Sequence, residues 1–101
     1  MNTTITVEIL LREIYLAETE LRWFEQKYGL LSETFYRLYE QGKLRHEDPN
    51  EIQTYLEWSG WWEVYQSRRK RYQQAIESRL QRISTPKSLS ELHISQLPIS
   101  T

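Results

Sequence analysis

Residues 54–73, with the sequence TYLEWSGWWEVYQSRRKRYQ, read as one continuous helix and decide the expected fold. Three of the four tryptophans stand here, directly before a block of four cations from Arg68 to Arg71. Aromatic and arginine side chains are the types that anchor protein interfaces. Their concentration within about five helical turns predicts either an aromatic core or a contact surface.

Mostly apolar and aromatic residues recur at spacings of three and four along this stretch and beyond it, which predicts a helix from about residue 49 to 83. The line of residues with this spacing, the seam, is expected to pack on another helix. The seam of this helix consists of Tyr55, Trp58, Trp62, Tyr65, Arg69, Tyr72, Ile76, Leu80 and Ile83. The start is marked by Asp48 as N-cap and Pro49 as the first helical residue. Gly60 costs about 1 kcal/mol relative to Ala inside a helix. We therefore expect a local bend or the close approach of another backbone there.

Two shorter amphipathic segments precede this helix. The first is predicted to be helical from about residue 5 to 28, with Gly29 ending it in the left-handed conformation. Its seam is Val7, Leu10, Ile14, Ala17, Leu21, Phe24 and Tyr28. Residues 4–7 alternate β-branched side chains and are also compatible with a short strand. Ser32 is expected to cap a short helix from about 32 to 41, which Gly42 stops.

These segments predict an all-α fold with two long antiparallel helices, about 5–28 and 49–83, and a short corner helix at about 32–41. Residues 1–84 form the predicted helical hairpin domain. The Ser-rich residues 85–101 form a predicted flexible tail that orders on a partner. Because two long helices bury little surface, we expect the seam to be covered by the short helix and the tail, by a second copy or by another protein.

The composition excludes several classes of protein. A chain of 101 residues holds one small domain, and only three glycines and three prolines favour helices over a turn-rich β fold. The absence of cysteine removes disulfides and thiolate metal sites and fits a reducing compartment, so we expect the cytoplasm. No apolar run near the N-terminus approaches the ~20 residues that a membrane span needs.

The net charge of −1 conceals a strong asymmetry along the chain. Residues 1–65 carry six cations against twelve anions, a charge of −6, whereas residues 66–87 carry seven against one, a charge of +6. The second half is therefore expected to act electrostatically on a nucleic acid, on an acidic protein or on the chain's own acidic first helix.

The aromatic and basic residues of the long helix lie on two faces, because consecutive helical residues are about 100° apart. Trp58, Trp62 and Tyr65 are predicted to lie in the core, whereas Trp61 lies off the seam. The candidate partner-binding residues are Trp61, Arg68, Arg69, Arg71, Arg79 and Arg82. Except for Arg69, they form one stripe, which is either a solvated charged face or a contact with an acidic protein or with nucleic-acid phosphates.

Arg69 belongs to the predicted seam, where an unpaired cation is costly. We expect it to form an ion pair with Glu13 or Glu20 of the first helix. The alternative is an open edge where Arg69 meets a partner.

No residue pattern indicates catalysis. His46 and His93 are far apart in the sequence, and neither stands in a constellation that suggests a triad. Metal-ligand spacings and glycine-rich phosphate loops are absent as well. The sequence therefore predicts a non-enzymatic protein without a cofactor or metal.

Four short stretches resemble a family of small prokaryotic proteins whose members look like the antitoxin halves of toxin–antitoxin gene pairs. The resemblance lies in residues 24–36 (FEQKYGLLSETFY), 42–44 (GKL), 57–58 (EW) and 63–65 (EVY). It implies a non-enzymatic protein that binds and neutralises a co-encoded toxin, commonly a nuclease, and that takes part in repressing its own operon. An antitoxin-like interaction module is thus the expected function. The alternatives are a small nucleic-acid-binding subunit that uses the basic stripe, and a self-associating helical scaffold.

Overall fold

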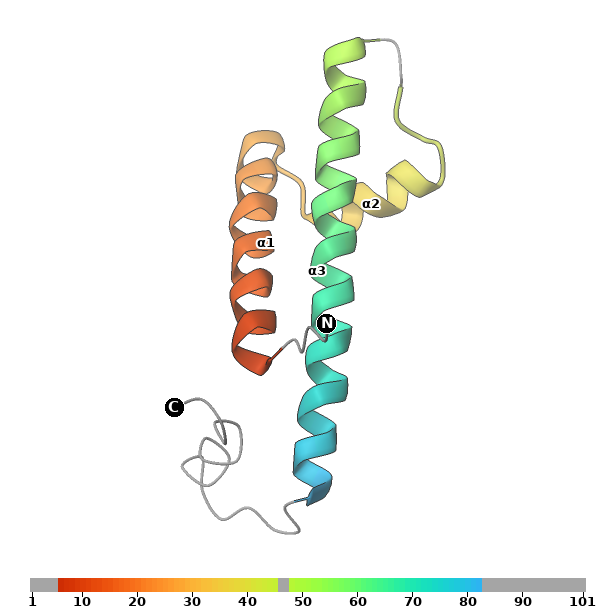
Figure 1. Ribbon diagram of the computed structural model, residues 1–101. Helices are drawn as coiled ribbons and strands as arrows, with labels where there is room; N and C mark the ends of the chain where they lie inside the picture. Colours follow the sequence, from red (N-terminus) through yellow and green to blue (C-terminus); the bar gives the residue numbers. More distant parts are fainter. Residues whose placement is uncertain (1–5, 46–47, 83–101) are drawn as a thin grey trace, which may run out of the picture.

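The computed structural model describes residues 6–45 and 48–82, which form three α-helices and no strand. Helix α1 spans Val7–Tyr28, α2 spans Ser32–Glu40 and α3 spans Pro49–Arg82. The two long helices lie side by side and antiparallel, and the short α2 lies across one half of α3 (Figure 1). The predicted all-α hairpin with a corner helix is confirmed. The predicted tail 85–101, both histidines and residues 4–5 lie outside the described residues.

The ends of α1 are set by local capping interactions. The Thr6 hydroxyl oxygen accepts a hydrogen bond from the Ile9 N–H at 3.2 Å, so the helix begins at Val7 rather than at residue 5. Gly29 ends it with φ 67°, the left-handed conformation that the sequence predicts. At the start of α3, Asp48 Oδ1 accepts from the Asn50 N–H at 2.9 Å, so Asp48 acts as the predicted cap.

Ser32 has a different role from the one predicted. It is the first residue of α2 rather than its cap, and it is fully buried. Its N–H donates to Glu25 Oε2 at 2.9 Å, and its hydroxyl accepts a hydrogen bond from Trp58 Nε1 at 2.9 Å. Ser32 thus links all three helices, through its backbone N–H and its hydroxyl together, which the spacing of the sequence does not reveal.

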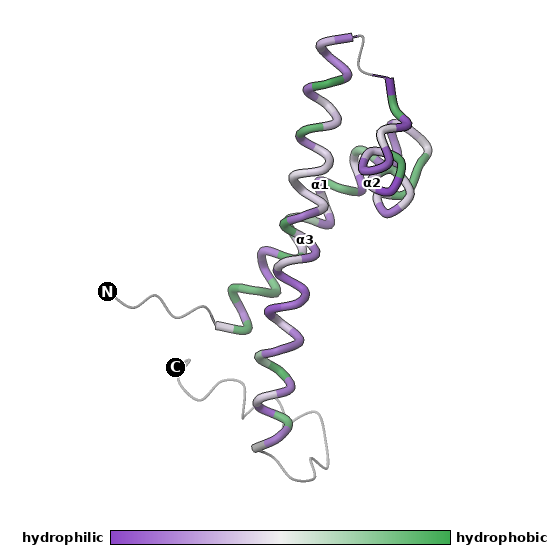
Figure 2. Tube along the Cα trace, turned by 90° about the vertical axis from the view of Figure 1, so that its right-hand side faces the viewer, coloured by the Kyte–Doolittle hydropathy of each residue, from purple (hydrophilic) through white to green (hydrophobic). Residues whose placement is uncertain are grey.

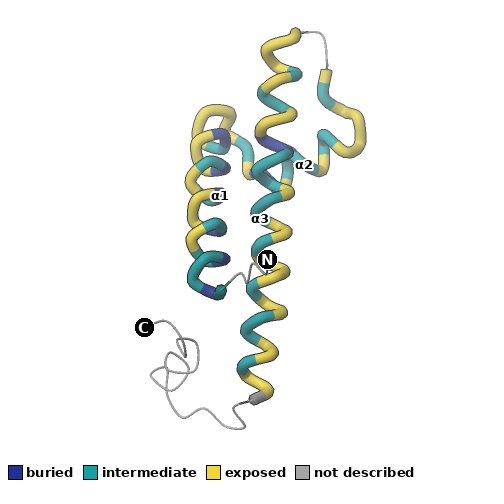
Figure 3. The backbone as a smooth tube through the Cα atoms, in the orientation of Figure 1, coloured by how far each residue is buried: buried dark blue, intermediate teal, exposed yellow. Residues whose placement is uncertain are grey.

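The core is aromatic and lies where the three helices meet. Trp58 of α3 is 2 % exposed, and its ring stacks on Phe35 of α2 with centroids 4.0 Å apart and on Phe24 of α1 at 5.3 Å. Leu21 completes this cluster. Figure 3 shows the buried positions along the inner side of α1 and in one short band of α3. Burial of these rings is the main apolar contribution to stability that the described residues provide.

The inner face of α1 agrees with the predicted seam. Its buried residues are Val7, Leu10, Ile14, Ala17, Leu21 and Phe24. Tyr28 is the exception at 46 % exposed, although its ring still stacks on Trp58 at 5.6 Å. The helical spacing therefore identified the face that packs on α3.

The seam of α3 shifts along the helix, which the sequence does not predict. Up to about residue 65, α3 has both α1 and α2 as neighbours, and Trp62 and Tyr65 pack against the core as expected. Beyond that point the less exposed positions are Arg68, Tyr72, Ala75, Ile76 and Arg79. Tyr72 and Ile76 agree with the predicted seam, whereas Arg68 and Arg79 take the places predicted for Arg69 and Leu80. The contact line is thus shifted by one residue at these two positions.

Gly60 lies within an uninterrupted α3, and the expected close approach of a backbone is wrong. A Cβ added there would meet nothing within 4 Å. The described chain therefore gives no packing reason for a glycine at this position.

None of the described helices is both long enough and apolar enough to cross a membrane.

Candidate protein-interaction surfaces

The predicted internal ion pair exists, but it uses a different arginine. Arg68 Nε donates to Glu13 Oε1, and the two side chains are 29 % and 38 % exposed. Glu13 is one of the two partners proposed for Arg69, so the predicted ion pair of Arg69 is wrong and the neighbouring Arg68 takes its place. The reason is the shifted contact line, which turns Arg68 toward α1.

Arg69 lies instead on an exposed face of α3. Its guanidinium carbon is 5.5 Å from the centre of the Tyr65 ring, and Nη1 donates to the Tyr65 hydroxyl at 3.4 Å. This contact holds Arg69 along the helix, and the residue also lines a hollow of about 340 Å³ whose other walls include Glu18, Glu25 and Glu33.

The other predicted partner-binding residues do not form one exposed stripe. Trp61 is half-buried and packs against the aromatic core, and Arg71 is exposed. Arg79 is half-buried, with Nη1 enclosed and without a hydrogen-bond partner among the described residues. Arg82 is the last residue of α3, and its side chain lies outside the description. Binding of a partner by these residues stays a prediction.

An exposed apolar face of α1, which the sequence reasoning missed, is formed by Tyr15, Leu16 and Trp23. These side chains are 59 %, 53 % and 54 % exposed. At 100° per residue they lie on the side of α1 opposite its buried seam, so they point away from α3. Lys27 Nζ lies 4.8 Å from the centre of the Trp23 ring. The test that singled out Trp61, an aromatic residue off the seam, would also have found Tyr15 and Trp23.

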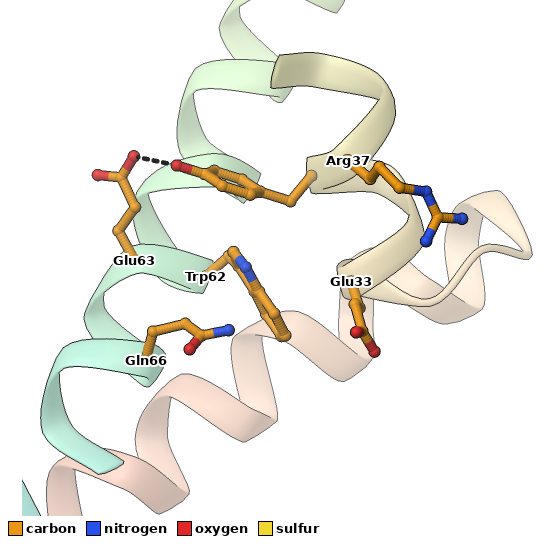
Figure 4. A pocket seen from close by; sticks show the side chains of 6 residues that line it. Glu33, Arg37, Trp62, Glu63 and Gln66 are labelled. Carbon is orange, nitrogen blue, oxygen red and sulfur yellow. Dashed lines mark hydrogen bonds between the residues drawn. The ribbon is translucent and has the colours of Figure 1, made fainter. Parts of the chain in front are cut away.

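A hollow of about 500 Å³ lies between α2 and α3 (Figure 4). It is lined by Glu33, Tyr36, Arg37, Trp62, Glu63 and Gln66. The Tyr36 hydroxyl donates to Glu63 Oε2 at 2.9 Å. This hydrogen bond, followed by burial and by Glu40, raises the pKa of Tyr36 to about 12, because each opposes the charged phenolate. The hollow thus combines aromatic walls with a negative potential.

Within residues 6–45 and 48–82 no cluster of three or more His, Cys, Asp or Glu side chains is arranged to hold a metal ion. No protein-family model matches the chain, and no curated protein or solved structure is significantly similar to it. A function for this chain is therefore inferred from its exposed residues and hollows.

Proposed function

We propose that this chain is a non-enzymatic interaction module, an antitoxin-like protein that binds and neutralises a co-encoded toxin in the cytoplasm. The observation that supports a binding role most strongly is the outer face of α1, where Tyr15, Leu16 and Trp23 are more than half exposed. A helix that is apolar on two opposite sides is typical of one packed between two neighbours. The described chain supplies one neighbour, α3, on the inner side.

The size of the exposed side chains favours a protein as the second neighbour. Fully burying a large apolar side chain contributes about 1.5–3 kcal/mol, so covering three of them offsets a substantial part of the cost of association. Tyrosine and tryptophan are also enriched among the residues that dominate binding energy. Exposed apolar groups gathered on one face mark interaction sites more often than single exposed residues do.

The identity of the partner as a toxin is proposed from the sequence resemblance in residues 24–36, 42–44, 57–58 and 63–65. Several of these residues lie in the aromatic core or its caps, so they support the fold of such a family more directly than its binding surface. In this proposal the outer face of α1 presents the apolar contact.

The test is co-expression of the chain with the product of the adjacent gene. We expect the two proteins to co-purify, and the double substitution Tyr15→Ser/Trp23→Ser to weaken the complex by about 2 kcal/mol or more, roughly thirtyfold in Kd. The matched control is Leu56→Ser, which removes a side chain that is 53 % exposed on α3. Failure to co-purify, or equal losses in the double variant and the control, would contradict the proposal.

Nucleic-acid binding is the second candidate, because Arg69, Lys70 and Arg71 are all exposed. Phosphate contacts by these residues would make the affinity fall steeply with salt. A mobility-shift assay with single- and double-stranded DNA and RNA at low salt tests this function. No shift under those conditions rules it out.

A further inference from the structure

Two neighbouring hollows of opposite chemistry lie along one face of α3. The first is the α2–α3 hollow, which contains Trp62 and Glu63. The second, of about 370 Å³, is lined by Gln66, Arg69, Lys70 and Gln73. Gln66 lines both of them, so an acidic, aromatic surface passes directly into a basic one.

The residues of this face share one side of the helix. Residues 62, 66, 69 and 73 recur at spacings of four and three, with 63 and 70 beside them, whereas Arg68 and Tyr72 turn toward α1. All six are exposed except Trp62, which is half-buried. The face is therefore accessible and separate from the outer face of α1.

Aromatic and acidic residues precede Gln66 on this face, and basic residues follow it at the same spacings. Glu63 stands three residues before it and Arg69 three residues after it, while Trp62 and Lys70 stand four residues before and after. A two-fold axis at Gln66, perpendicular to α3, brings together residues that lie on the same side of Gln66 around the helix. At 100° per residue, Glu63 and Lys70 lie on one side and Trp62 and Arg69 on the other. The axis would therefore bring Glu63 of one helix opposite Lys70 of the other, and Arg69 opposite the ring of Trp62, a pairing that cation–π attraction favours.

The carboxylates of the α2–α3 hollow are available to bind further cations. Glu63 uses Oε2 to accept from Tyr36, which leaves Oε1 available. Glu33 forms no ion pair within the described residues. Arg37 is a cation that lines the same hollow, and Figure 4 shows its guanidinium directed away from Trp62.

We propose that two copies of this chain form an isologous dimer through this face, with Arg69 and Lys70 of each copy entering the acidic, aromatic hollow of the other. The two-fold symmetry makes every contact twice and closes the assembly at two copies. The outer face of α1 stays free for a different partner.

The first measurement is the molar mass of the purified chain alone by light scattering over a concentration series. It is made at about 0.01 M and about 1 M salt, where the Debye lengths are about 30 and 3 Å. We expect a dimer at low salt, with a dissociation constant on the order of tenfold higher at high salt. A monomer under both conditions overturns the proposal, as does an open series of larger assemblies, which would indicate head-to-tail contacts.

The second measurement uses opposite charge reversals. Glu63→Lys places like charges together at both symmetry-related contacts, and Lys70→Glu does the same with the opposite sign. Each variant alone should dissociate at least about tenfold more readily. An equimolar mixture should form a heterodimer with an affinity close to that of the wild type, because both contacts become attractive again. No recovery on mixing contradicts the two-fold arrangement.

Two controls separate this contact from general charge effects. Glu57→Lys and Arg71→Glu make the same changes in net charge on the opposite side of α3, and both should leave the dimer intact. Loss of the dimer in these variants to the same extent would overturn the proposal.

If Glu63→Lys fails to fold because it loses the bond to Tyr36, Glu33→Lys reverses a charge in the same hollow and replaces it in the mixing experiment. Because no partner protein is present, the result is independent of toxin binding.

Discussion

The two halves of α3 show how differently one periodic pattern can be used. Around Trp58 the helix lies against both α1 and α2, and its aromatic residues form the core. Beyond Tyr65 it contacts mainly α1, and no described side chain in that half is fully buried. Figure 2 shows the second half as largely hydrophilic. The number of neighbouring helices, and not the seam spacing alone, therefore decides where a long helix contributes residues to the core.

The largest expected effect comes from removing the ring at the three-helix junction. Trp58→Ala should destabilise the fold by about 3–5 kcal/mol, because it leaves a cavity between Phe24 and Phe35 and removes three stacked contacts, the third with Tyr28. The free energy of unfolding in urea measures it. Trp23→Ala is the control, since that ring is 54 % exposed, and it should cost less than about 1 kcal/mol. Similar losses for both would show that the junction is not the core.

The next effect tests the polar link within the same junction. Ser32→Ala removes the acceptor of the Trp58 Nε1 hydrogen bond and leaves a buried donor unsatisfied, at a cost of about 1–3 kcal/mol. Ser67→Ala, at an exposed serine of the second half of α3, should change stability by less than about 0.5 kcal/mol. Thermal unfolding of both variants makes the comparison. A neutral Ser32→Ala would mean that water replaces the hydroxyl.

Gly60 provides a substitution with the opposite sign. Gly60→Ala should stabilise the isolated chain by about 1 kcal/mol, because the added Cβ meets nothing within 4 Å and Ala is the better helix former. Gly42→Ala is the contrasting control and should destabilise, because Gly42 has φ 67°. Chemical denaturation of the two variants tests both signs. A destabilising Gly60→Ala would indicate that α3 has a local distortion at Gly60.

The smallest effect is expected in the second half of α3. The Arg68–Glu13 pair is partly exposed, so a double-mutant cycle with alanine at both positions should give a coupling of about 0.2–1 kcal/mol that decreases with salt. The same cycle for Arg69 and Glu13 should give a coupling near zero. A larger coupling through Arg69 would restore the original assignment of the ion pair.

Local sequence signals predicted the elements well. Gly29, the Asp48-Pro49 start and the seam from Val7 to Phe24 depend on backbone preferences and on the period of one helix, so they can be recognised without knowing the fold. Ser32 could not be assigned in this way. A serine near a helix start suits a cap, and only the position of the Trp58 indole shows that its hydroxyl belongs to the core.

The candidate surfaces were predicted less well because each depends on which side of a helix is covered. The sequence placed Arg69 in the seam and Arg68 outside it, whereas in the structure Arg68 pairs with Glu13 and Arg69 is exposed. Tyr15 and Trp23 were detectable as aromatics off a seam. Their exposure, however, depends on where α2 and α3 pack.

The amino-acid sequence is sufficient to show that this chain is helical and where its helices begin and end within a few residues. It also shows that negative charge is concentrated in residues 1–65 and positive charge in residues 66–87. These features arise from the backbone preferences of neighbouring residues and from composition. The tertiary structure alone decided which arginine pairs with Glu13, which serine lies in the core and which aromatics stay exposed. Each of those outcomes depends on the crossing of three helices, and a side chain's environment is set by residues distant in the sequence.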